Sequence, residues 1–434
     1  MTIGCGRGLL GRRVAGVAAV ALVAGLSLSA CAGGSSSQTG TPPSSGHQNL
    51  PLADVHLTAA QIADLGRDDD LFAGDLVKAM AAGQTGNLVL SPASIATALQ
   101  MLTDGARGQT QQQLESALHA SGLNDRELTA ASAQLLLELR GLSKQVTMSN
   151  NVWVQQGDSV TPEFAADMKS GFDGALHSID FSNTSAAAST INQAISNETG
   201  GHINNLVSPD SLVSAITVLT DAIYLHADWA SPFQSNQTDP AMFTPAAGST
   251  EQVPTMHQQA TWGYLAGDGY QVVTLPYEGG RLAMSIFLPS LGSSPASVED
   301  KAAGVGFTAL LSGAKPTPVM LSLPKFQLRT STDLVSVLQS LGVTDAFSSS
   351  ADLSGICGQC QVSSVEHQAW IRTDEKGTTA AAATSVGVTA GAVEENPPGV
   401  VQMNVDRPFL AVVRDTKTGL PLFVAQVANP SLGS

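Results

Sequence analysis

The sequence is poor in basic residues. Its 434 residues include 20 Lys and Arg against 36 Asp and Glu, which gives a formal net charge of −16. Proteins bind nucleic acids and other polyanions mainly through clustered Lys and Arg side chains, and no such cluster is present. The composition therefore argues against nucleic acid and against heparin-like polyanions as partners.

The sequence also lacks the motifs that identify many catalytic sites. It contains no G-x-S-x-G turn, no H-E-x-x-H zinc pair and no phosphate-binding P-loop. A Ser–His–Asp triad is recognised by geometry, so scattered residues of these types are poor evidence for one. We therefore predict no enzyme activity, no metal and no cofactor. The eight histidines are scattered along the chain: His47, His56, His119, His177, His202, His226, His257 and His367.

Only four cysteines are present, of which Cys5 and Cys31 lie near the N-terminus. The other two, Cys357 and Cys360, form a C-G-Q-C unit. In an exported chain a local disulfide is favoured for this unit, although so small a ring contributes little through chain entropy. A zinc site would need a second pair of ligands, and a redox motif would need its own strand–helix setting.

The N-terminal segment indicates export. Three arginines precede an apolar run at 14–28, which ends in Leu-Ser-Ala followed by Cys31. This is the layout of a signal peptide over residues 1–30, and it resembles the bacterial lipobox, in which the cysteine is lipidated. Ordinary secretion and a short membrane helix are the alternatives, but the run is short for spanning a bilayer.

The segment after the lipobox predicts a tether. Gly, Ser, Thr and Pro dominate from Ala32 to Gly46, so we expect residues 31–53 to be lipidated at Cys31 and flexible. The remainder, 54–434, contains no internal repeat and predicts one domain with a large core. The expected location is the outer side of the cell membrane, through a lipid anchor, or the medium after secretion.

The stretch from Thr378 to Gly391 combines two opposing signals. It contains no charge, proline or aromatic ring, and its alternating pattern fits a strand with one face on a core. Small and Gly-rich sequences are nevertheless poor strand formers. The segment therefore looks able to become a strand without being committed to one. A flexible linker and a short alanine helix are the alternatives.

The residues around this stretch resemble a known family. Glu375-Lys376-Gly377-Thr378-Thr379 and the following alanines closely resemble the hinge of the serpins, protease inhibitors with a mobile reactive loop. The stretch Met403–Leu410 resembles part of their C-terminal signature. Further matches follow in order along the chain: Asn87–Ala96, Val218–Leu225, Trp229, Val253–Met256, Leu323–Phe326, Ala351–Ile356, Gly419–Phe423 and Asn429-Pro430.

The resemblance implies an α+β fold with three β-sheets, eight or nine helices and an exposed reactive loop at about 375–400. The chain departs from the family pattern at Ala194, where a tryptophan is usual, and at Asp221, where an asparagine is usual. The implied sites are a hinge (Glu375, Gly377, Thr378, Ala380, Ala381, Ala382 and Ala383), a shutter beneath the main sheet (Ser91, Ser94, Asp221 and His367) and a breach residue (Trp229).

The resemblance also implies a suicide inhibitor, active as a monomer, whose partner is a protease. The protease cuts the loop and forms an acyl-enzyme, and the cut loop inserts into the main sheet as a new strand. Family spacing places the cut at Gly391-Ala392, within two or three residues. These small residues suit an elastase- or subtilisin-like serine protease, or a cysteine protease, whereas a later cut at 394–395 would suit a glutamate-specific one. The alternative is a non-inhibitory serpin that acts as a binding or chaperone-like module.

The substitution at Asp221 leads to a hypothesis about pH. By resemblance, His367 hydrogen-bonds to the residue at this position, and a carboxylate there would favour the protonated imidazole. We therefore expect opening of the main sheet to depend on pH between about 5 and 8, where histidines commonly titrate.

Overall fold

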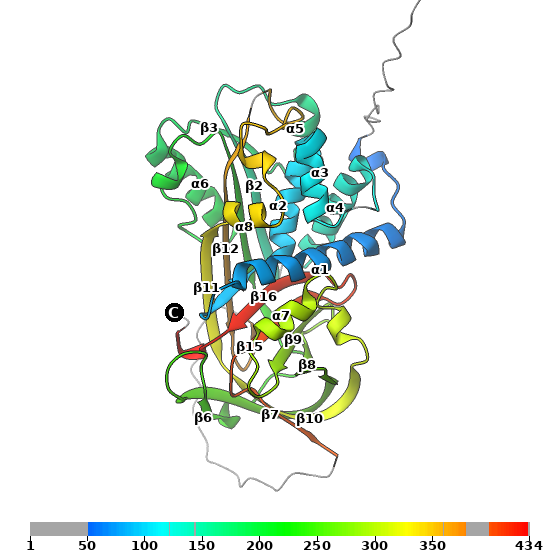
Figure 1. Ribbon diagram of the computed structural model, residues 1–434, viewed down its shortest axis with the longest axis vertical. Coiled ribbons are helices and arrows are strands. Elements are labelled where there is room, and N and C mark those ends of the chain that lie inside the picture. The colour runs from blue at the N-terminus through cyan, green and yellow to red at the C-terminus, as the bar shows by residue number, and fades with distance from the viewer. Residues whose placement is uncertain (1–50, 121, 143–144, 359, 379–398, 433–434) are drawn as a thin grey trace, which may run out of the picture. The chain divides into compact units, whose positions relative to one another are not determined.

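The computed structural model describes residues 51–120, 122–142, 145–358, 360–378 and 399–432 (Figure 1). The stretch from Gln48 onward forms one compact unit. The predicted signal peptide, Cys31 and most of the predicted tether lie outside the described residues. None of the helices described is long and apolar enough to cross a membrane.

Eight α-helices are described, which agrees with the eight or nine expected. They are α1 (Ala59–Ala81), α2 (Pro92–Gly105), α3 (Gly108–Ala117), α4 (Asp125–Arg140), α5 (Pro162–Gly171), α6 (Thr184–Glu198), α7 (Ala296–Ala302) and α8 (Val335–Ser340). Six short 3-10 turns lie at Leu52–Asp54, Asp210–Leu212, Ser235–Gln237, Ala309–Leu311, Asp345–Phe347 and Pro430–Leu432.

The main sheet has seven strands in the order β3-β2-β4-β12-β13-β5, with β11 paired to β12. Its two central strands, β4 and β12, are parallel neighbours. The strands are β2 (Val146–Gln155), β3 (Leu176–Ile179), β4 (Thr217–Leu225), β5 (Ala227–Asp228), β11 (Phe326–Asp333), β12 (Val362–Thr373) and β13 (Gly377–Thr378).

The second sheet has nine strands in the order β1-β16-β15-β9-β8-β7-β10-β14, with β6 paired to β7. They are β1 (Leu88–Leu90), β6 (Thr238–Phe243), β7 (Glu251–Gly267), β8 (Tyr270–Pro276), β9 (Leu282–Pro289), β10 (Lys315–Pro324), β14 (Val401–Asn404), β15 (Phe409–Asp415) and β16 (Pro421–Val427).

The expected third sheet is not separate in the described part of the chain. The 17-residue strand β7 pairs with β6 and β10 along most of its length and with β8 at its C-terminal end. Because one long strand takes part in both sets of pairings, the two expected sheets are joined into the single nine-stranded one. The α+β class is as predicted.

Local sequence signals explain where two of the helices, α2 and α5, begin. Ser91 caps α2 by accepting a hydrogen bond from the backbone N–H of Ser94 at 3.2 Å, and Pro92 occupies the first turn. Thr161 caps α5 in the same way through the N–H of Phe164, at 3.3 Å. Helix α1 begins after Thr58, which forms a capping box with Gln61.

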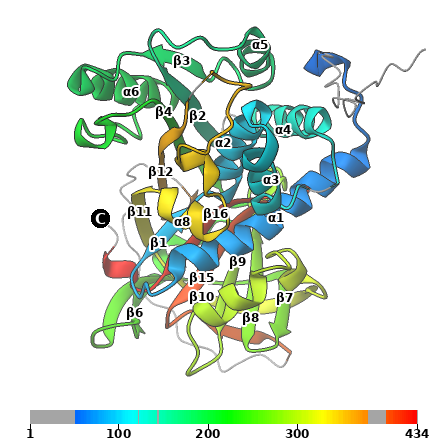
Figure 2. The same ribbon diagram turned by 45° about the horizontal axis from the view of Figure 1, so that its top comes forward.

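The two faces of the main sheet are covered by different helices. Nearly every residue of α2 is buried, and its apolar side chains join the large core shared with the nine-stranded sheet. Helix α6 packs over the other face, where Trp153, Val218 and Ala222 meet Ile191 and other apolar residues of α6. In Figure 2 α6 lies to one side of β2 and β4, and α2 to the other. An added strand between β4 and β12 would therefore run between these two helical layers.

Candidate functional site: the hinge, breach and shutter of the main sheet

The first hinge residues already lie in the main sheet. Strand β13 pairs antiparallel with β12, through Thr378 opposite Thr373, and antiparallel with β5, through Gly377 opposite Asp228. Strands β4 and β12 pair directly with each other only as far as Tyr224 and Trp370. Beyond that point β12 pairs with β13, which lies between β12 and the short strand β5 that follows β4. The first hinge residues thus lie at one end of the β4–β12 pairing.

The side chain of Thr378 is fully buried at this position. Its hydroxyl lies 2.6 Å from the phenol oxygen of Tyr277 and 3.4 Å from the hydroxyl of Thr373. Burial raises the pKa of Tyr277, so the phenol is neutral and can share its proton with Thr378. A small residue with one hydroxyl group suits this position, whereas a charged residue would be desolvated without an ion partner.

Glycine is required at 377 for a reason that the sequence does not reveal. Gly377 is not among the described residues with positive φ, so conformational freedom is not the reason. A Cβ at this position would instead lie 2.1 Å from the carbonyl oxygen of Ala227 and 2.6 Å from the Cα of Asp228. Gly377 therefore permits β13 to approach β5 closely.

Glu375 is held just outside the sheet. The Lys325 ammonium lies 2.8 Å and 3.0 Å from its two carboxylate oxygens, and the hydroxyl of Thr238 donates to it at 2.9 Å. Burial raises the pKa of Glu375, but these hydrogen bonds more than offset that effect and the pKa is lowered overall. The carboxylate thus connects the hinge to β6 and to the turn before β11.

Trp229 fixes the backbone on both sides of the hinge turn. Its indole N–H donates to the carbonyl oxygen of Asp374 at 3.0 Å, and its backbone N–H donates to that of Lys376 at 2.8 Å. The indole stacks on Tyr277 with ring centroids 4.5 Å apart. The predicted breach residue and the hinge residues are therefore brought together.

The four predicted shutter residues also meet, beneath the middle of the junction between β4 and β12, which we call the seam. The Ser94 hydroxyl donates to Asp221 Oδ1, and His367 Nδ1 lies 3.3 Å from the same oxygen. The backbone N–H of Ser91 donates to His367 Nε2 at 3.3 Å. The side chains of Asp221 and His367 are fully buried, and β4 and β12 place these two residues directly opposite each other.

The contacts of His367 assign a role to each ring nitrogen. Nε2 accepts a hydrogen bond from the backbone N–H of Ser91, so a ring proton belongs on Nδ1, on the side of Asp221. The expectation that the carboxylate favours the protonated ring stays a prediction.

The comparisons with known proteins agree with this geometry. The family model described as "Serpin (serine protease inhibitor)" matches residues 68–430. The chain is a serpin. It is 33% identical over 404 residues to an uncharacterized serpin-like protein of Thermococcus kodakarensis, covering 90% of this chain and 93% of the relative. It is 30% identical to human neuroserpin over 363 residues, covering 81% and 88% of the two chains.

Solved serpin structures superpose on the same fold. The thermophilic serpin tengpin in its native state matches with a TM-score of 0.76 and 26% identity, covering 86% of this chain and 95% of that one. Serpin48 of the insect Tenebrio molitor matches with a TM-score of 0.75 and 27% identity, covering 86% and 100%. Serpins are in general protease inhibitors and not catalysts, which is the class predicted from the hinge residues.

Several predicted sites of this serpin lie outside the described residues. They are the lipidation site Cys31, the hinge alanines Ala380, Ala381, Ala382 and Ala383, and the scissile pair Gly391 and Ala392. The described chain ends at Thr378 on one side of the loop and resumes at Gly399, just before β14, on the other.

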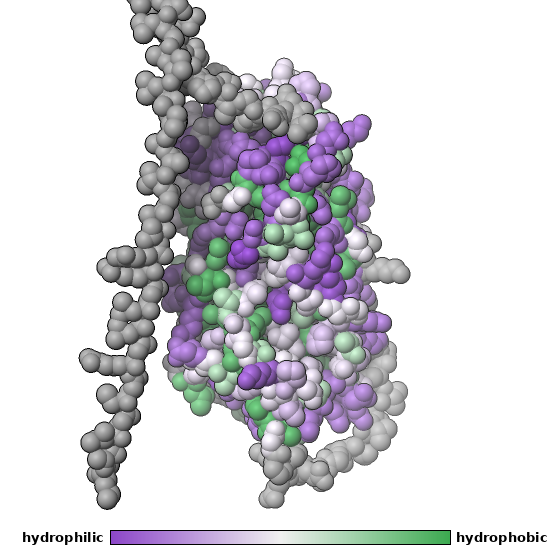
Figure 3. Space-filling model, turned by 90° about the vertical axis from the view of Figure 1, so that its right-hand side faces the viewer, coloured by the Kyte–Doolittle hydropathy of each residue, from purple (hydrophilic) through white to green (hydrophobic). Residues whose placement is uncertain are grey.

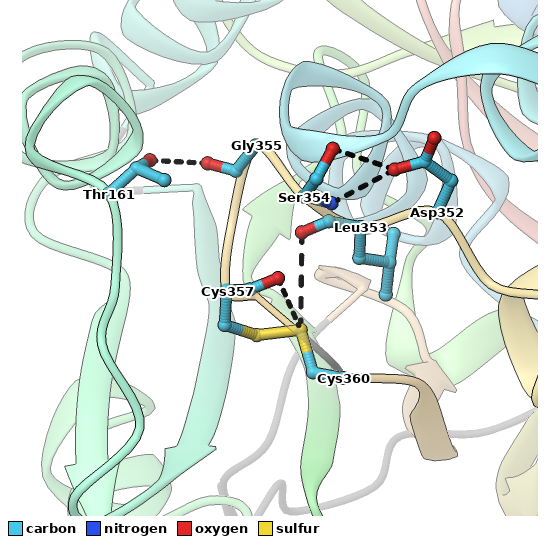
Figure 4. Close-up of a disulfide and its surroundings, with 7 residues drawn as sticks. All are labelled: Thr161, Asp352, Leu353, Ser354, Gly355, Cys357 and Cys360. Carbon is cyan, nitrogen blue, oxygen red and sulfur yellow. Dashed lines mark hydrogen bonds between the residues drawn. A yellow bond between two sulfur atoms is a disulfide. The ribbon is translucent and has the colours of Figure 1, made fainter.

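The C-G-Q-C unit of the serpin forms a disulfide between Cys357 and Cys360, whose Cα atoms are 5.9 Å apart (Figure 4). Both cysteines are buried. The backbone beside them holds the start of α5, because Thr161 donates its N–H to the carbonyl of Ile356 at 2.9 Å and its hydroxyl to that of Gly355. The disulfide turn therefore links the first residues of α5 to the segment that leads into β12.

Sequence reasoning did not assign a role to several residues that contact the site. Asn150 of β2 donates its amide to the Ser94 carbonyl at 2.8 Å and to the Ser94 hydroxyl at 3.1 Å. Tyr277, which contacts Thr378 and stacks on Trp229, is another. Asn150 stands beside Ser149 and Asn151 in a strand with several polar residues, so its type alone does not single it out.

We expect Asp221→Asn to flatten the pH dependence of loop insertion in this serpin. The expectation rests on the contact between His367 and the Asp221 carboxylate, which the variant replaces by an amide. The rate at which the cut loop inserts, followed from pH 5 to pH 8 in both proteins, measures the effect. Equal rates across this range in both proteins would contradict the hypothesis.

A second titratable group lies on the opposite face of the main sheet. Glu366 of β12 is 7% exposed and stands directly opposite Asp333 of β11. Burial, together with the Asp333 carboxylate, raises the pKa of Glu366 from 4.5 to about 7, although Ser364 and Ser211 act in the other direction. A raised carboxyl pKa means that the folded state binds this proton more tightly than the unfolded state does.

The serpin should therefore lose stability as the pH rises from about 4.5 to about 7, and Glu366→Gln should abolish that part of the loss. A shift of this size corresponds to about 3 kcal/mol, and partial solvent access reduces it to roughly 2 kcal/mol at pH 8. Urea unfolding at pH 5 and pH 8 measures the effect. The variant should be more stable than the wild type at pH 8 and similar to it near pH 4.5. A stabilisation of equal size at both pH values would show that packing, not ionisation, is responsible.

Proposed function

We propose that this serpin is an irreversible inhibitor of an extracellular protease, which it traps as an acyl-enzyme by inserting its cut loop between β4 and β12. The observation that carries the proposal is the position of β13, whose residues Gly377 and Thr378 already pair with β12 on one side and with β5, the short strand that follows β4, on the other. Insertion would continue a pairing that has begun, so no new nucleation is needed.

The register of β13 supports the predicted position of the cut. Continuing the antiparallel pairing of Thr378 with Thr373 brings Thr389 opposite Val362, the first residue of β12. The loop would then cross the sheet in about 11 residues, or roughly 36 Å. A cut at Gly391-Ala392 would fall just beyond the last paired residue. A protease bound there by an ester would be carried the full length of the sheet.

The side chains along the seam are compatible with an inserted strand. In this register the hinge alanines and Thr384 would stand opposite the C-terminal half of β12, between the two helical layers. Small side chains there would avoid steric clashes with the helices on either face. Family members that do not inhibit often carry bulky or charged residues in the hinge, and this chain has none between Thr378 and Val393. The hinge therefore favours inhibition over a purely binding role.

The target that fits the loop is a serine protease that cleaves after small residues, of the elastase or subtilisin kind, or a cysteine protease with a similar pocket. No Lys or Arg lies near Gly391 to fill a trypsin-like pocket. We place the inhibitor outside the cytoplasm as a monomer, anchored through a lipid on Cys31 and held off the membrane by residues 31–53. A tethered inhibitor would protect the cell surface locally.

A panel of purified proteases tests the proposal. Elastase- and subtilisin-like enzymes should give complexes that survive boiling in detergent, with a mass equal to the protease plus the serpin cut at one bond. Trypsin-like enzymes should give none. Cleavage of the loop by every enzyme in the panel with no covalent complex would replace inhibition by the binding or chaperone-like role.

A further inference from the structure

Three polar side chains form a row across β6, β7 and β10 of the nine-stranded sheet, remote in sequence from the hinge. His257 of β7 lies with Nδ1 2.9 Å from the Ser322 hydroxyl of β10 and with Nε2 3.2 Å from Asp239 Oδ1 of β6. His257 and Ser322 are directly opposite each other in the antiparallel pairing. The Ser322 carbonyl accepts from Val405 on the other side, so this is the closely spaced, non-hydrogen-bonded type of pair.

The contacts determine which nitrogen of His257 carries the proton. An ionised carboxylate only accepts hydrogen bonds, so Nε2 donates to Asp239 and Nδ1 presents its lone pair to Ser322. The serine hydroxyl in turn donates to Nδ1. This is the arrangement of a nucleophile, a base and a carboxylate that orients the base. The His257 side chain is 32% exposed and that of Asp239 is 70% exposed, so reagents from solvent reach the row.

We propose that Ser322 is an activated nucleophile that becomes acylated by activated esters, with His257 as its general base and Asp239 as a positioning residue. The proposal does not depend on the inhibitory function. It supplies the Ser–His–Asp geometry that the sequence could not reveal.

The surroundings of Ser322 define the class of substrate. Strand β10 is paired on both sides, with β7 and β14, so its backbone N–H groups serve the sheet and do not form an oxyanion hole. The neighbour of Ser322 on β14 is Asn404, an exposed residue whose amide belongs to the same face of the sheet. One side-chain donor suits esters with good leaving groups, such as aryl esters, and not peptides.

The acyl-transfer step balances without any further reagent. The Ser322 oxygen attacks the ester carbonyl while its proton passes to His257 Nδ1. The bond from the carbonyl carbon to the aryl oxygen then breaks, and the leaving aryl oxide takes that proton. The products are acyl-Ser322 and a phenol. Water attacks the acyl group in a slower second step, with His257 again receiving the proton, and returns the serine and a carboxylic acid.

4-Nitrophenyl acetate tests the proposal on the full chain. The expected result is a burst of one equivalent of nitrophenol per chain, with one acetyl group mapped to Ser322 by peptide mass. Ser322→Ala should abolish the burst, and His257→Gln should slow it by about 100-fold or more. Asp239→Asn should slow it by several-fold and Asp239→Glu should restore it, which a purely structural role would not predict. Ser331→Ala, which removes an exposed serine of β11, is the matched control and should leave the burst unchanged.

Two outcomes would overturn the proposal. Acetyl groups spread over lysines and surface serines, with the same initial rate in Ser322→Ala, would show that Ser322 is an ordinary hydroxyl. A burst that survives His257→Gln at full rate would show that the row is only a hydrogen-bonded surface cluster. Thermal unfolding of each variant beside the wild type keeps either result from being attributed to misfolding.

Discussion

Thr378→Arg is expected to convert the inhibitor into a substrate. Thr378 is completely buried between β12 and β5, where it contacts Tyr277, and the residues directly opposite it, Thr373 and Ala227, carry no charge, so an arginine there would lose its hydration. Removing β13 from the sheet relieves that cost, but the loop can then no longer start its insertion. Deacylation would therefore finish before the protease is trapped.

The expected size of the effect is large. Covalent complex should fall by about 100-fold or more relative to cut loop, because each 1.4 kcal/mol of added insertion barrier slows that step tenfold and a buried unpaired charge costs several kcal/mol. The measurement is the ratio of complex to cleaved serpin at equal protease. Thr378→Val is the matched control, since it keeps the size and loses only the hydroxyl contact. Undiminished trapping in Thr378→Arg would contradict the role assigned to the hinge.

Cutting the loop once, without a trapped protease, is expected to make the serpin far more resistant to heat. An inserted strand of about 11 residues would pair on both sides, and each hydrogen bond contributes roughly 0.5–1.5 kcal/mol net. Ordering these residues costs about 1–2 kcal/mol each and offsets much of that gain, whereas burial of the inserted side chains adds to it. A net gain of about 5 kcal/mol in a domain of this size would correspond to a rise in Tm of roughly 10 °C.

Calorimetry before and after limited proteolysis measures this change, and the far-ultraviolet spectrum should show added strand. The hinge variant Thr378→Arg provides the control, because its cut form should keep the Tm of the uncut protein. A wild-type Tm that does not move on cutting would remove the energetic basis of the proposed mechanism.

Short-range signals allowed much of this structure to be predicted. Ser91 followed by proline, and Thr161 followed by proline, are typical helix starts, and the structure has helices at both places. The hinge residues fixed the family, and the family supplied the shutter and the breach. These features depend on a few neighbouring residues or on a stretch that resembles a family motif, and both can be recognised in a single sequence.

The features that the sequence did not reveal depend on register between distant strands. The merging of two sheets through β7, the carboxylate pair of Glu366 and Asp333, and the row from Asp239 to Ser322 all follow from which residues stand opposite each other. Gly377 shows the same limit, because its role lies in the approach to a segment about 150 positions earlier in the chain. No local pattern encodes such distances.

The exposed apolar side chains give little indication of a permanent partner. The large ones in the described chain are Leu137, Val213, Met242, Leu291 and Val305, which come from different parts of the fold. On the face shown in Figure 3, apolar and polar residues are interspersed. The proposed protease contact is therefore expected to depend on the loop and not on a preformed apolar surface.

The parallel pairing of β4 with β12 determines how such an inhibitor can be used. Parallel strand pairings are slightly less stable than antiparallel ones. The proposed inserted strand would replace this one parallel pairing by two antiparallel pairings. Nothing in the exchange restores the starting arrangement, so under the proposed mechanism each molecule would act once. The number of protease molecules restrained would then be limited by the number of inhibitor molecules made, and used molecules would have to be replaced by new synthesis.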